Sequence, residues 1–340
     1  MAFANYSCNN VECLIFANYM KLPEYQNLAS KKEFMEQIVI NTPKEFDEWF
    51  EGFGDERFIY RGSCEAKYMN FTFAQRDWIT KEWAKVLQVP FADFVHRLIS
   101  KIANNNLLLN YLKSLNIWPN DILWLSFMQH YGMPTPLLDF TKDKKIGLFF
   151  ATDGLKHNPS DVDVENYFSF YALQRTDTIF PVDTLFASGI ENGKKFVEEF
   201  RRNNPGAQVD DSILRNIDEM TKWIKKDGSR DGLSTMPFLF VPNPLDAKVV
   251  MSITGERLYW SNPNIIAQKG CFVINTSDSL PLEEAIAKNG NNPPLISVDI
   301  HKSLVDYIKK NYISDLNHDN IYPKFKKQAE ISYDEFKSKL

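Results

Sequence analysis

Hydrophobic and polar positions along this chain follow two periods, and both predict ordered elements. Apolar residues spaced three and four positions apart predict helices over 43–52, 78–113, 120–131, 142–150, 193–202, 210–226 and 301–312. Short apolar runs rich in β-branched and aromatic residues predict strands over 36–41, 57–60, 137–138, 167–173, 237–241 and 270–275. Elements interspersed in this way predict an α+β fold, a single mixed domain with a central, largely antiparallel sheet flanked by helices.

Local signals set the expected ends of several helices. The segment Thr42 to Glu45 has the spacing of a capping box, with proline at the first helical position. Pro90 is expected to break the 78–113 stretch into two pieces, and Gly132 is expected to end the 120–131 helix. Thr141 is the expected N-cap of the helix that follows it.

The composition predicts one densely packed domain. Of the 340 residues, 44% are hydrophobic and 14% are aromatic, which is enough apolar surface for a large core. The chain contains no internal repeat, low-complexity tract or convincing linker. The expected organisation is an N-terminal cap at 1–35, one domain at 36–330 and a C-terminal tail at 331–340.

Charge and cysteine content narrow the functional classes. The net charge is −5, and the basic group Lys324, Lys326 and Lys327 is expected to be a solvated face, so nucleic acid is disfavoured as a partner. The four cysteines are scattered, and no Asp/Glu/His cluster has ligand spacing, so neither a disulfide framework nor a metal site is expected. No stretch has the pattern of a signal peptide or a membrane span, which predicts a cytoplasmic protein without a membrane partner.

The tripeptide Tyr60-Arg61-Gly62 ends the strand predicted at 57–60 and is the first candidate for a functional site. An arginine at a strand end can direct its guanidinium group into a cleft, where the fork of N–H groups binds phosphate or carboxylate. Gly62 permits a close approach of the backbone. The alternative is an arginine that is tied to a buried aspartate and only stabilises the fold.

The second candidate is the segment that leads into the strand predicted at 137–138. Asp139 follows two leucines at the exit of that strand, where an unpaired carboxylate would be costly, so Arg61 is its expected partner. His130 ends the preceding helix and could carry a proton near neutral pH, although a histidine in that position more often has a structural role. The polar residues expected to cluster with His130 are Gln129, Thr135 and Asp139.

Together these residues resemble the FRG domain, a family named for an aromatic-Arg-Gly signature. The resemblance covers about residues 36–330 and rests on the blocks 60–62, 129–141, 148–151 and 262–272. The long second block is specific to the family, whereas the tripeptide alone is not. Family members are widespread in bacteria and phages and often resemble parts of defence or toxin systems, so the resemblance implies an effector of that kind.

The chain departs from the family pattern at two positions. Pro136 stands where the family usually has an arginine before Leu-Leu-Asp, and Asn264 stands where an arginine follows Asn-Pro. If those arginines bind an anionic ligand, this chain binds it in a different way. Arg257 is the candidate for replacing the lost charge.

One interpretation is an enzyme that acts on a nucleotide. The aromatic-Arg-Gly strand resembles the first motif of ADP-ribosyltransferases, in which an arginine at a strand end holds a dinucleotide phosphate. This resemblance implies NAD as the candidate cofactor, with ADP-ribosyl transfer or NAD hydrolysis as the reaction. Arg61 would bind phosphate, Tyr60 or Phe140 would stack on a ring, and Asp139 or Glu256 would stabilise the developing ribosyl cation.

The other interpretation is a binding module without turnover. In it, Arg61, Asp139, His130 and Gln268 form a polar network that fixes a pocket for a small molecule or for a protein partner such as a phage protein. The missing arginines favour this interpretation, and only the weak segment 274–277 is similar to later motifs of the transferases. A nuclease, another hydrolase and a purely structural network are further alternatives, so the sequence leaves open whether the protein is an enzyme.

Overall fold

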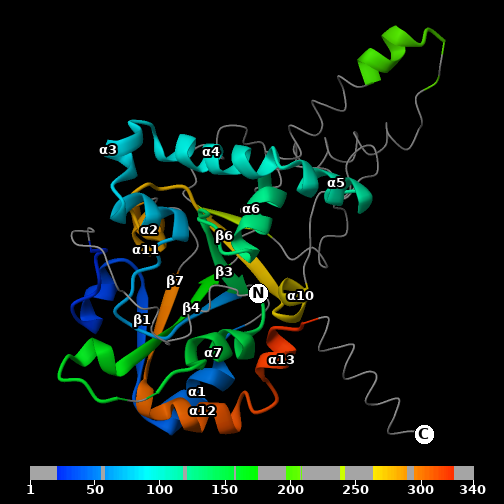
Figure 1. Cartoon of the computed structure of the whole chain (residues 1–340). Helices are drawn as coiled ribbons and strands as arrows, with labels where there is room; N and C mark the ends of the chain where they lie inside the picture. Colours follow the sequence, from blue (N-terminus) through cyan, green and yellow to red (C-terminus); the bar gives the residue numbers. More distant parts are fainter. Residues whose placement is uncertain are drawn as a thin grey trace, which may run out of the picture.

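A seven-stranded sheet forms the centre of the protein. The computed structural model describes residues 21–54, 58–117, 121–156, 158–174, 197–206, 208, 238–241, 263–288 and 295–324. The strands are β1 (Glu36–Ile40), β2 (Phe58–Ser63), β3 (Leu137–Thr141), β4 (Tyr167–Gln174), β5 (Phe238–Val241), β6 (Gly270–Asn275) and β7 (Leu295–His301). Their order across the sheet is β1-β7-β4-β2-β3-β6-β5 (Figure 1). Only the β1–β7 pair is parallel among these neighbours, which confirms the predicted α+β fold with a largely antiparallel sheet.

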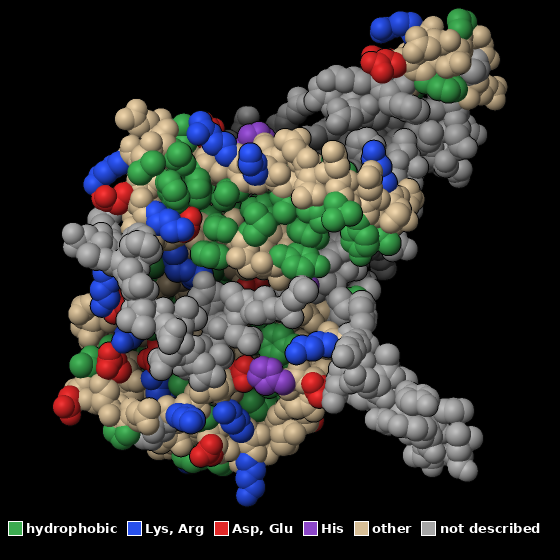
Figure 2. All heavy atoms as spheres, in the orientation of Figure 1, with side chains coloured by type: hydrophobic (Ala, Val, Ile, Leu, Met, Phe, Trp, Pro, Cys, Tyr) green, Lys and Arg blue, Asp and Glu red, His purple; other side chains and the backbone are tan. Residues whose placement is uncertain are grey.

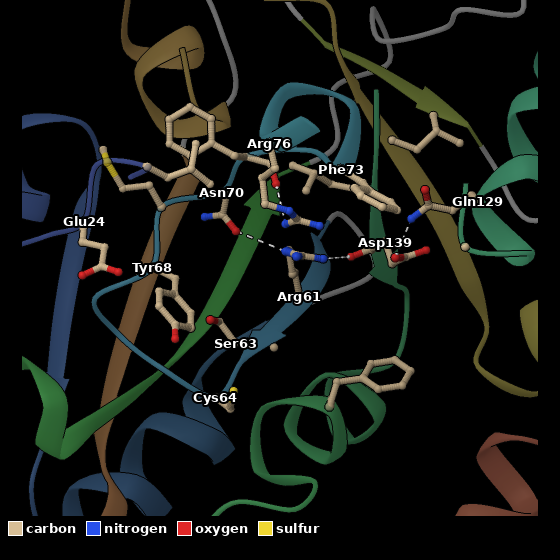
Figure 3. A pocket seen from close by; sticks show the side chains of 18 of the residues that line it. Glu24, Arg61, Ser63, Cys64, Tyr68, Asn70, Phe73, Arg76, Gln129 and Asp139 are labelled. Atoms are coloured by element: carbon tan, nitrogen blue, oxygen red, sulfur yellow. Dashed lines mark hydrogen bonds between the residues drawn. The ribbon is translucent and has the colours of Figure 1, made fainter. Parts of the chain in front are cut away.

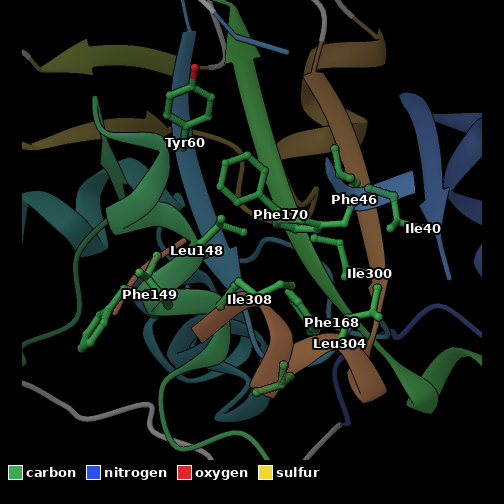
Figure 4. Packing of buried hydrophobic residues seen from close by; sticks show 14 of the residues in the cluster. Ile40, Phe46, Tyr60, Leu148, Phe149, Phe168, Phe170, Ile300, Leu304 and Ile308 are labelled. Atoms are coloured by element: carbon green, nitrogen blue, oxygen red, sulfur yellow. The ribbon is translucent and has the colours of Figure 1, made fainter. Parts of the chain in front are cut away.

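Helices cover both faces of the sheet. They are η1 (Leu28–Glu33), α1 (Pro43–Gly52), α2 (Phe73–Thr80), α3 (Trp83–Leu87), α4 (Phe91–Ala103), α5 (Asn106–Ser114), α6 (Asp121–His130), α7 (Lys144–Thr152), η2 (Asp163–Asn166), α10 (Pro263–Ala267), α11 (Leu282–Lys288), η3 (Lys302–Leu304), α12 (Val305–Asn311) and α13 (His318–Ile321). Figure 1 shows α1, α7 and α12 grouped together, and Figure 4 shows the core that they cover, with Phe46, Leu148, Phe170 and Ile308 in contact. On the opposite face, Tyr25 and residues of α11 pack against β2, β4 and β6.

Most predicted elements are present, but several of their ends differ. The capping box at Thr42 is confirmed, and Pro90 does precede a new helix. The 78–113 stretch is divided among four helices instead of two, because the chain also breaks at Glu82, which adopts left-handed backbone angles, and at Asn104 and Asn105, which cap α4 and α5. The helix predicted from residue 301 begins at Val305, since β7 continues through His301. Of the helix predicted at 193–202, residues 197–203 are helical, whereas the one at 210–226 lies outside the described residues.

The N-cap of α7 is Asp143 and not Thr141. The Asp143 Oδ1 atom accepts hydrogen bonds from the backbone N–H groups of Lys145 at 2.9 Å and Ile146 at 3.4 Å. Thr141 is instead the last residue of β3, and its hydroxyl donates to the carbonyl of Gln268 at 2.7 Å. Two possible capping residues stand two positions apart, and the extra length of the strand decides between them.

A buried ion pair ties η1 to the sheet. Lys31 is fully buried, and its Nζ lies 2.5 Å from Asp299 Oδ1 on β7 and 2.7 Å from the Ser169 hydroxyl on β4. Gln37 donates to the other carboxylate oxygen of Asp299 at 2.7 Å, so both charges have several partners. Breaking a buried pair of this kind leaves an uncompensated charge. At least the η1 part of the predicted N-terminal cap is therefore anchored to the central sheet.

The surface carries a strip of exposed apolar side chains over α3 to α5 (Figure 2). Exposed large hydrophobic residues of this part of the chain include Val86, Leu107, Tyr111 and Leu115. Within the described part of the chain, none of the helices has both the length and the apolar character that crossing a bilayer requires.

Gly62 allows β2 and α7 to approach more closely than any other residue would. A Cβ at this position would overlap the backbone nitrogen of Ala151 and lie 2.5 Å from the carbonyl oxygen of Gly147, both on α7. Gly147 approaches the sheet in the same way, because a Cβ there would lie 2.8 Å from the ring of Phe170. The glycine of the Tyr60-Arg61-Gly62 motif is thus required for strand-to-helix packing.

We predict that Gly62→Ala lowers the free energy of unfolding by about 3 kcal/mol or more, because the added methyl group meets backbone atoms that cannot rotate away. Urea-induced unfolding followed by circular dichroism measures this change. Gly52→Ala is the matched control, since no atom lies within 4 Å of a Cβ there and the residue is helical. It should be neutral or stabilising by up to about 1 kcal/mol. Equal stability of the two variants would contradict the packing argument.

Candidate functional site

The sheet divides between β2 and β3. These strands share a single residue pair, Tyr60 with Thr141. Beyond that pair, β2 stays with β4 as far as Ser63, while β3 stays with β6 back to Leu137. The two strands therefore diverge, and we call the gap between 61–63 and 137–139 the fork.

A cleft of about 420 Å³ opens at the fork (Figure 3). Pockets for small molecules occupy roughly 300–1,000 Å³, so its size suits a ligand. Side chains that line it come from β2, β3, α2, α6, α7 and the segments around residues 24 and 68; they include Arg61, Asp139, Phe73, Arg76, Gln129, Phe150, Glu24 and Tyr68. Residues from both faces of the sheet reach the cleft because the strands part there.

Arg61 spans the fork and is held on both sides of it. Its Nε donates to Asn70 Oδ1 at 3.1 Å, and its Nη1 donates to the backbone carbonyl of Asp139 at 2.9 Å. Arg61 thus bonds the main chain of Asp139, and not its carboxylate as the sequence suggested. Burial lowers the pKa of Arg61, and the nearby Asp139 charge offsets part of that effect. The Nη2 group donates no hydrogen bond to a described residue, which leaves it available to a ligand.

Arg76 brings a second guanidinium group into the cleft. Its Nη1 donates to the carbonyl of Phe71 at 3.0 Å, and its guanidinium carbon lies 5.7 Å from the ring centroid of Phe73. The charge of Arg76 lowers the pKa of both Arg61 and Asp139, so the three groups interact electrostatically. Sequence reasoning missed Arg76, because nothing in its local pattern distinguishes it from a solvated helical arginine.

Asp139 presents its carboxylate to the cleft. Gln129 donates to Asp139 Oδ2 at 2.8 Å, and the hydroxyl of Thr135 bonds the other end of the Gln129 amide. Burial raises the pKa of Asp139, while Arg61 and the Gln129 amide lower it. Its side chain is accessible from within the cleft even though protein surrounds it on most sides. The predicted grouping of Gln129, Thr135 and Asp139 is thus found in three dimensions.

His130 lies outside this cleft. It faces a smaller, adjoining pocket of about 20 Å³, which Phe140 and Gln268 also line and which shares Gln129, Asp139 and Phe150 with the cleft. Burial lowers the pKa of His130 to about 4, so the imidazole is neutral at physiological pH. That value disfavours the predicted role of His130 as a proton carrier near neutral pH.

Two aromatic candidates belong to the core. Tyr60 is buried with its ring centroid 5.3 Å from that of Phe170 (Figure 4). Phe140 is buried in another cluster, with residues of β2 and β6. Neighbouring residues of a strand point to opposite faces, so Tyr60 turns away from the side that carries Arg61. The expected ring stacking by Tyr60 or Phe140 therefore has no place in this cleft. The aromatic residues that do line it are Tyr68, Phe71, Phe73 and Phe150.

The remaining candidates are spread more widely. Gln268 donates to the carbonyl of Ile321 at 3.0 Å and so anchors α13. Glu256 and Arg257 lie outside the described residues. Pro136 and Asn264, the two positions where an arginine was expected, do not line the cleft, nor does the segment 274–277. No group of three or more His, Cys, Asp or Glu residues in the described parts of the chain is arranged to hold a metal ion.

The low pKa of His130 gives a testable pH dependence. An unfolded histidine titrates near pH 6.5, so between about pH 6.5 and 4 the unfolded chain binds a proton that the folded protein excludes. Stability should therefore fall as the pH falls through this window, and His130→Gln should reduce the loss. In NMR titrations of the folded protein, the His130 signal should shift with a midpoint of about 4. A midpoint near 6.5 would contradict the burial of the ring.

Comparison with known protein families gives one match. Residues 56–160 match the family model of the FRG domain. This span contains β2 and β3, the fork between them, and the cleft residues Arg61, Arg76, Gln129 and Asp139. No curated protein and no solved structure matches the chain. The family match includes the aromatic-Arg-Gly strand at the fork, and the chain contains an FRG domain over residues 56–160.

Proposed function

We propose that the cleft binds a nucleotide-like ligand through its phosphate groups, and that the protein acts on such a ligand, with NAD as the first candidate. The observation that carries the proposal is the pair of guanidinium groups, Arg61 and Arg76, in one cleft of about 420 Å³. Guanidinium groups bind phosphate through parallel charge-assisted hydrogen bonds. Arg61 is already fixed by two of its donors, so little side-chain entropy is lost when its remaining donors bind an anion.

The charges around the cleft favour an anion. Its acidic side chains are Asp139 and Glu24, and Glu24 already pairs with Lys21 at 3.1 Å. Asp139 has a raised pKa, so its negative charge is weakened relative to a solvated carboxylate. The two arginines keep their charge at any physiological pH. A phosphate group between them would restore the balance of charge.

The walls of the cleft suit the apolar parts of a nucleotide. Phe73 comes from α2, Phe150 from α7 and Tyr68 from the loop between β2 and α2, so aromatic residues from three segments line the same cleft as the two arginines. Aromatic faces stack on bases and on nicotinamide with little sequence preference. A ligand with both rings and phosphates uses more of this surface than inorganic phosphate does.

Asp139 is the candidate for chemistry. In NAD cleavage the bond between C1′ of the ribose and the nicotinamide nitrogen breaks, and its electron pair leaves with nicotinamide. The carboxylate would stabilise the positive charge that develops on the ribose. Water, or a hydroxyl of an acceptor, then bonds to C1′ and gives up its proton, which yields hydrolysis or ADP-ribosyl transfer. Gln129 and Thr135 would orient the carboxylate for this task.

A binding module without turnover is the second candidate function. It is favoured because no histidine is among the described residues that line the cleft, and His130, in the adjoining pocket, has a pKa of about 4. Both functions begin with the same binding step and differ only in whether product forms. Either function is compatible with a bacterial defence or toxin-type effector. In that proposal the protein would restrict growth of the cell, and substitutions in the cleft would abolish the effect.

Replacement of either cleft arginine should weaken nucleotide binding. For Arg61→Ala and Arg76→Ala we expect the Kd for NAD, measured by calorimetry, to rise at least about tenfold, which corresponds to about 1.4 kcal/mol. Arg61→Lys should recover only part of the affinity, because an ammonium group cannot bind phosphate through a planar fork. Arg97→Ala removes an exposed arginine on α4 outside the cleft and is the matched control. Unchanged affinity in both cleft variants would remove the cleft from the function.

Asp139→Asn should separate binding from chemistry. The amide keeps the size of the side chain and removes its charge, so the Kd for NAD should stay the same or fall. Nicotinamide release should slow about 100-fold or more, because the developing cation loses its counter-charge. Asp143→Asn, which alters a helix cap that pairs with Lys269, is the control. Tight NAD binding without nicotinamide release in the unmodified protein would favour the binding module.

A further inference from the structure

Glu283 is a buried carboxylate that the proposed chemistry does not use. It lies in the first turn of α11, is completely buried and does not line the cleft. It accepts hydrogen bonds from the Tyr25 hydroxyl at 2.9 Å and from the backbone N–H of Asn70 at 3.0 Å, and forms no salt bridge with a described residue. Burial raises the pKa of Glu283. Burying an ionisable group costs free energy, so a buried glutamate at this position indicates a role other than filling space in the core.

The contacts of Glu283 lead directly to Arg61. Asn70 is held at three points: its N–H donates to the Glu283 carboxylate, its carbonyl accepts from the backbone N–H of Leu282 at 3.1 Å, and its Oδ1 accepts from Arg61 Nε at 3.1 Å. The start of α11 therefore clamps the main chain of Asn70 on both sides. Figure 3 shows the result, with the Asn70 side chain directed at the Arg61 guanidinium group. No other described side chain accepts from Arg61.

The same loop is also held from its other side. The backbone N–H of Tyr25 donates to the carbonyl of Lys67 at 2.8 Å, and Glu24 forms an isolated β-bridge with Tyr68. Tyr25 also reaches Glu283 through its hydroxyl. The loop that carries Asn70 is thus fixed between the segment 24–25 and the start of α11, and Glu283 joins the two.

We propose that Glu283 is a positioning residue of the cleft, which holds Asn70 so that Asn70 can orient Arg61 toward the ligand. The consequence for ligand binding rests on the nucleotide-binding function proposed above. The positioning of Arg61 itself does not, because it is a property of the protein without ligand.

Positioning and simple electrostatics predict opposite effects when the carboxylate is neutralised. The negative charge of Glu283 raises the pKa of Arg61, so it acts on the cleft across a short distance. Removing a negative charge near an anion site would by Coulomb's law strengthen anion binding. If Glu283 instead orients Arg61 through Asn70, its replacement loosens Arg61 and weakens anion binding. The sign of the change therefore distinguishes the two.

Glu283→Gln tests this with the full-length protein. Glutamine keeps the size of the side chain, but its single carbonyl oxygen can take only the place of Oε1, which accepts from both Tyr25 and Asn70. The NH₂ group then replaces Oε2 and removes the 3.3 Å contact with the Asn70 N–H, while the remaining bond weakens because its acceptor is no longer charged. We expect hydrogen exchange at Arg61 Nε, followed by NMR with the signal assigned through Arg61→Lys, to become about tenfold faster. We expect the Kd for NAD to rise about fivefold, the equivalent of one hydrogen bond. Unchanged exchange, or tighter NAD binding, would overturn the proposal.

Two further variants separate positioning from loss of stability. Asp47→Asn alters a carboxylate that accepts from the hydroxyls of Tyr307 at 2.8 Å and Tyr312 at 2.5 Å, on the side of the sheet covered by α1 and α12. It should lower the melting temperature without changing exchange at Arg61 Nε. Tyr25→Phe removes only one hydrogen bond to Glu283 and serves if Glu283→Gln does not fold; it should speed the exchange by a smaller factor. An Asp47→Asn protein with equally fast exchange would assign Glu283 a merely structural role.

The two readouts keep this inference separate from the proposed function. If NAD does not bind the unmodified protein, the nucleotide proposal fails, while exchange at Arg61 Nε still decides whether Glu283 positions Arg61. If NAD binds and Glu283→Gln changes neither exchange nor affinity, the nucleotide proposal stands and the positioning role of Glu283 is wrong.

Discussion

The divergence of β2 from β3 after one residue pair is the constraint on which the rest of the site depends. In a continuous antiparallel ladder, the pairs after Tyr60 and Thr141 would join Arg61 to Phe140 and Gly62 to Asp139 and close the sheet. Instead β2 remains bonded to β4 over its whole length and is pressed onto α7 at Gly62, where there is no room for a side chain. The gap that results is bridged by a side chain, since Arg61 donates to the carbonyl of Asp139. One guanidinium group therefore both completes the fold and points a charge at the cleft.

The positive charges of the two arginines at this gap are balanced by carboxylates from several elements. Arg61 and Arg76 are offset by the carboxylate of Asp139 in the cleft and by that of Glu283 behind it. Asn70 lies between, so that one residue links a surface-accessible arginine to a fully buried glutamate. Such networks hold one geometry because each unsatisfied member would be costly. The Lys31–Asp299 pair on the same face of the sheet is likewise buried with multiple hydrogen bonds.

The surroundings of His130 and Asp139 also decide which of the two is the better candidate for a catalytic group. His130 and Asp139 are close in sequence, yet the imidazole is excluded from the cleft and held neutral, while the carboxylate is presented to it. Burial acts on both groups in the same physical way, because it disfavours the charged form. Only Asp139 has nearby cations that counter this effect and keep a charge available where a ligand would bind.

The sequence by itself determined the fold class, most of the strands and helices, and the capping box at Thr42. It also singled out Arg61, Gln129 and Asp139, which the structure places in one cleft. These features follow from local periodicity, from capping chemistry and from motifs in which the residues stand close together. It did not reveal Arg76, Asn70 or Glu283, and it placed Tyr60 and His130 in the site although one lies in the core and the other faces the adjoining pocket. Those positions depend on where two strands stop pairing and on which face of a strand a side chain occupies. Only the tertiary structure decided them, because the contacts between Arg61, Asn70 and Glu283 join segments more than 200 residues apart through the packing of α11 against the sheet.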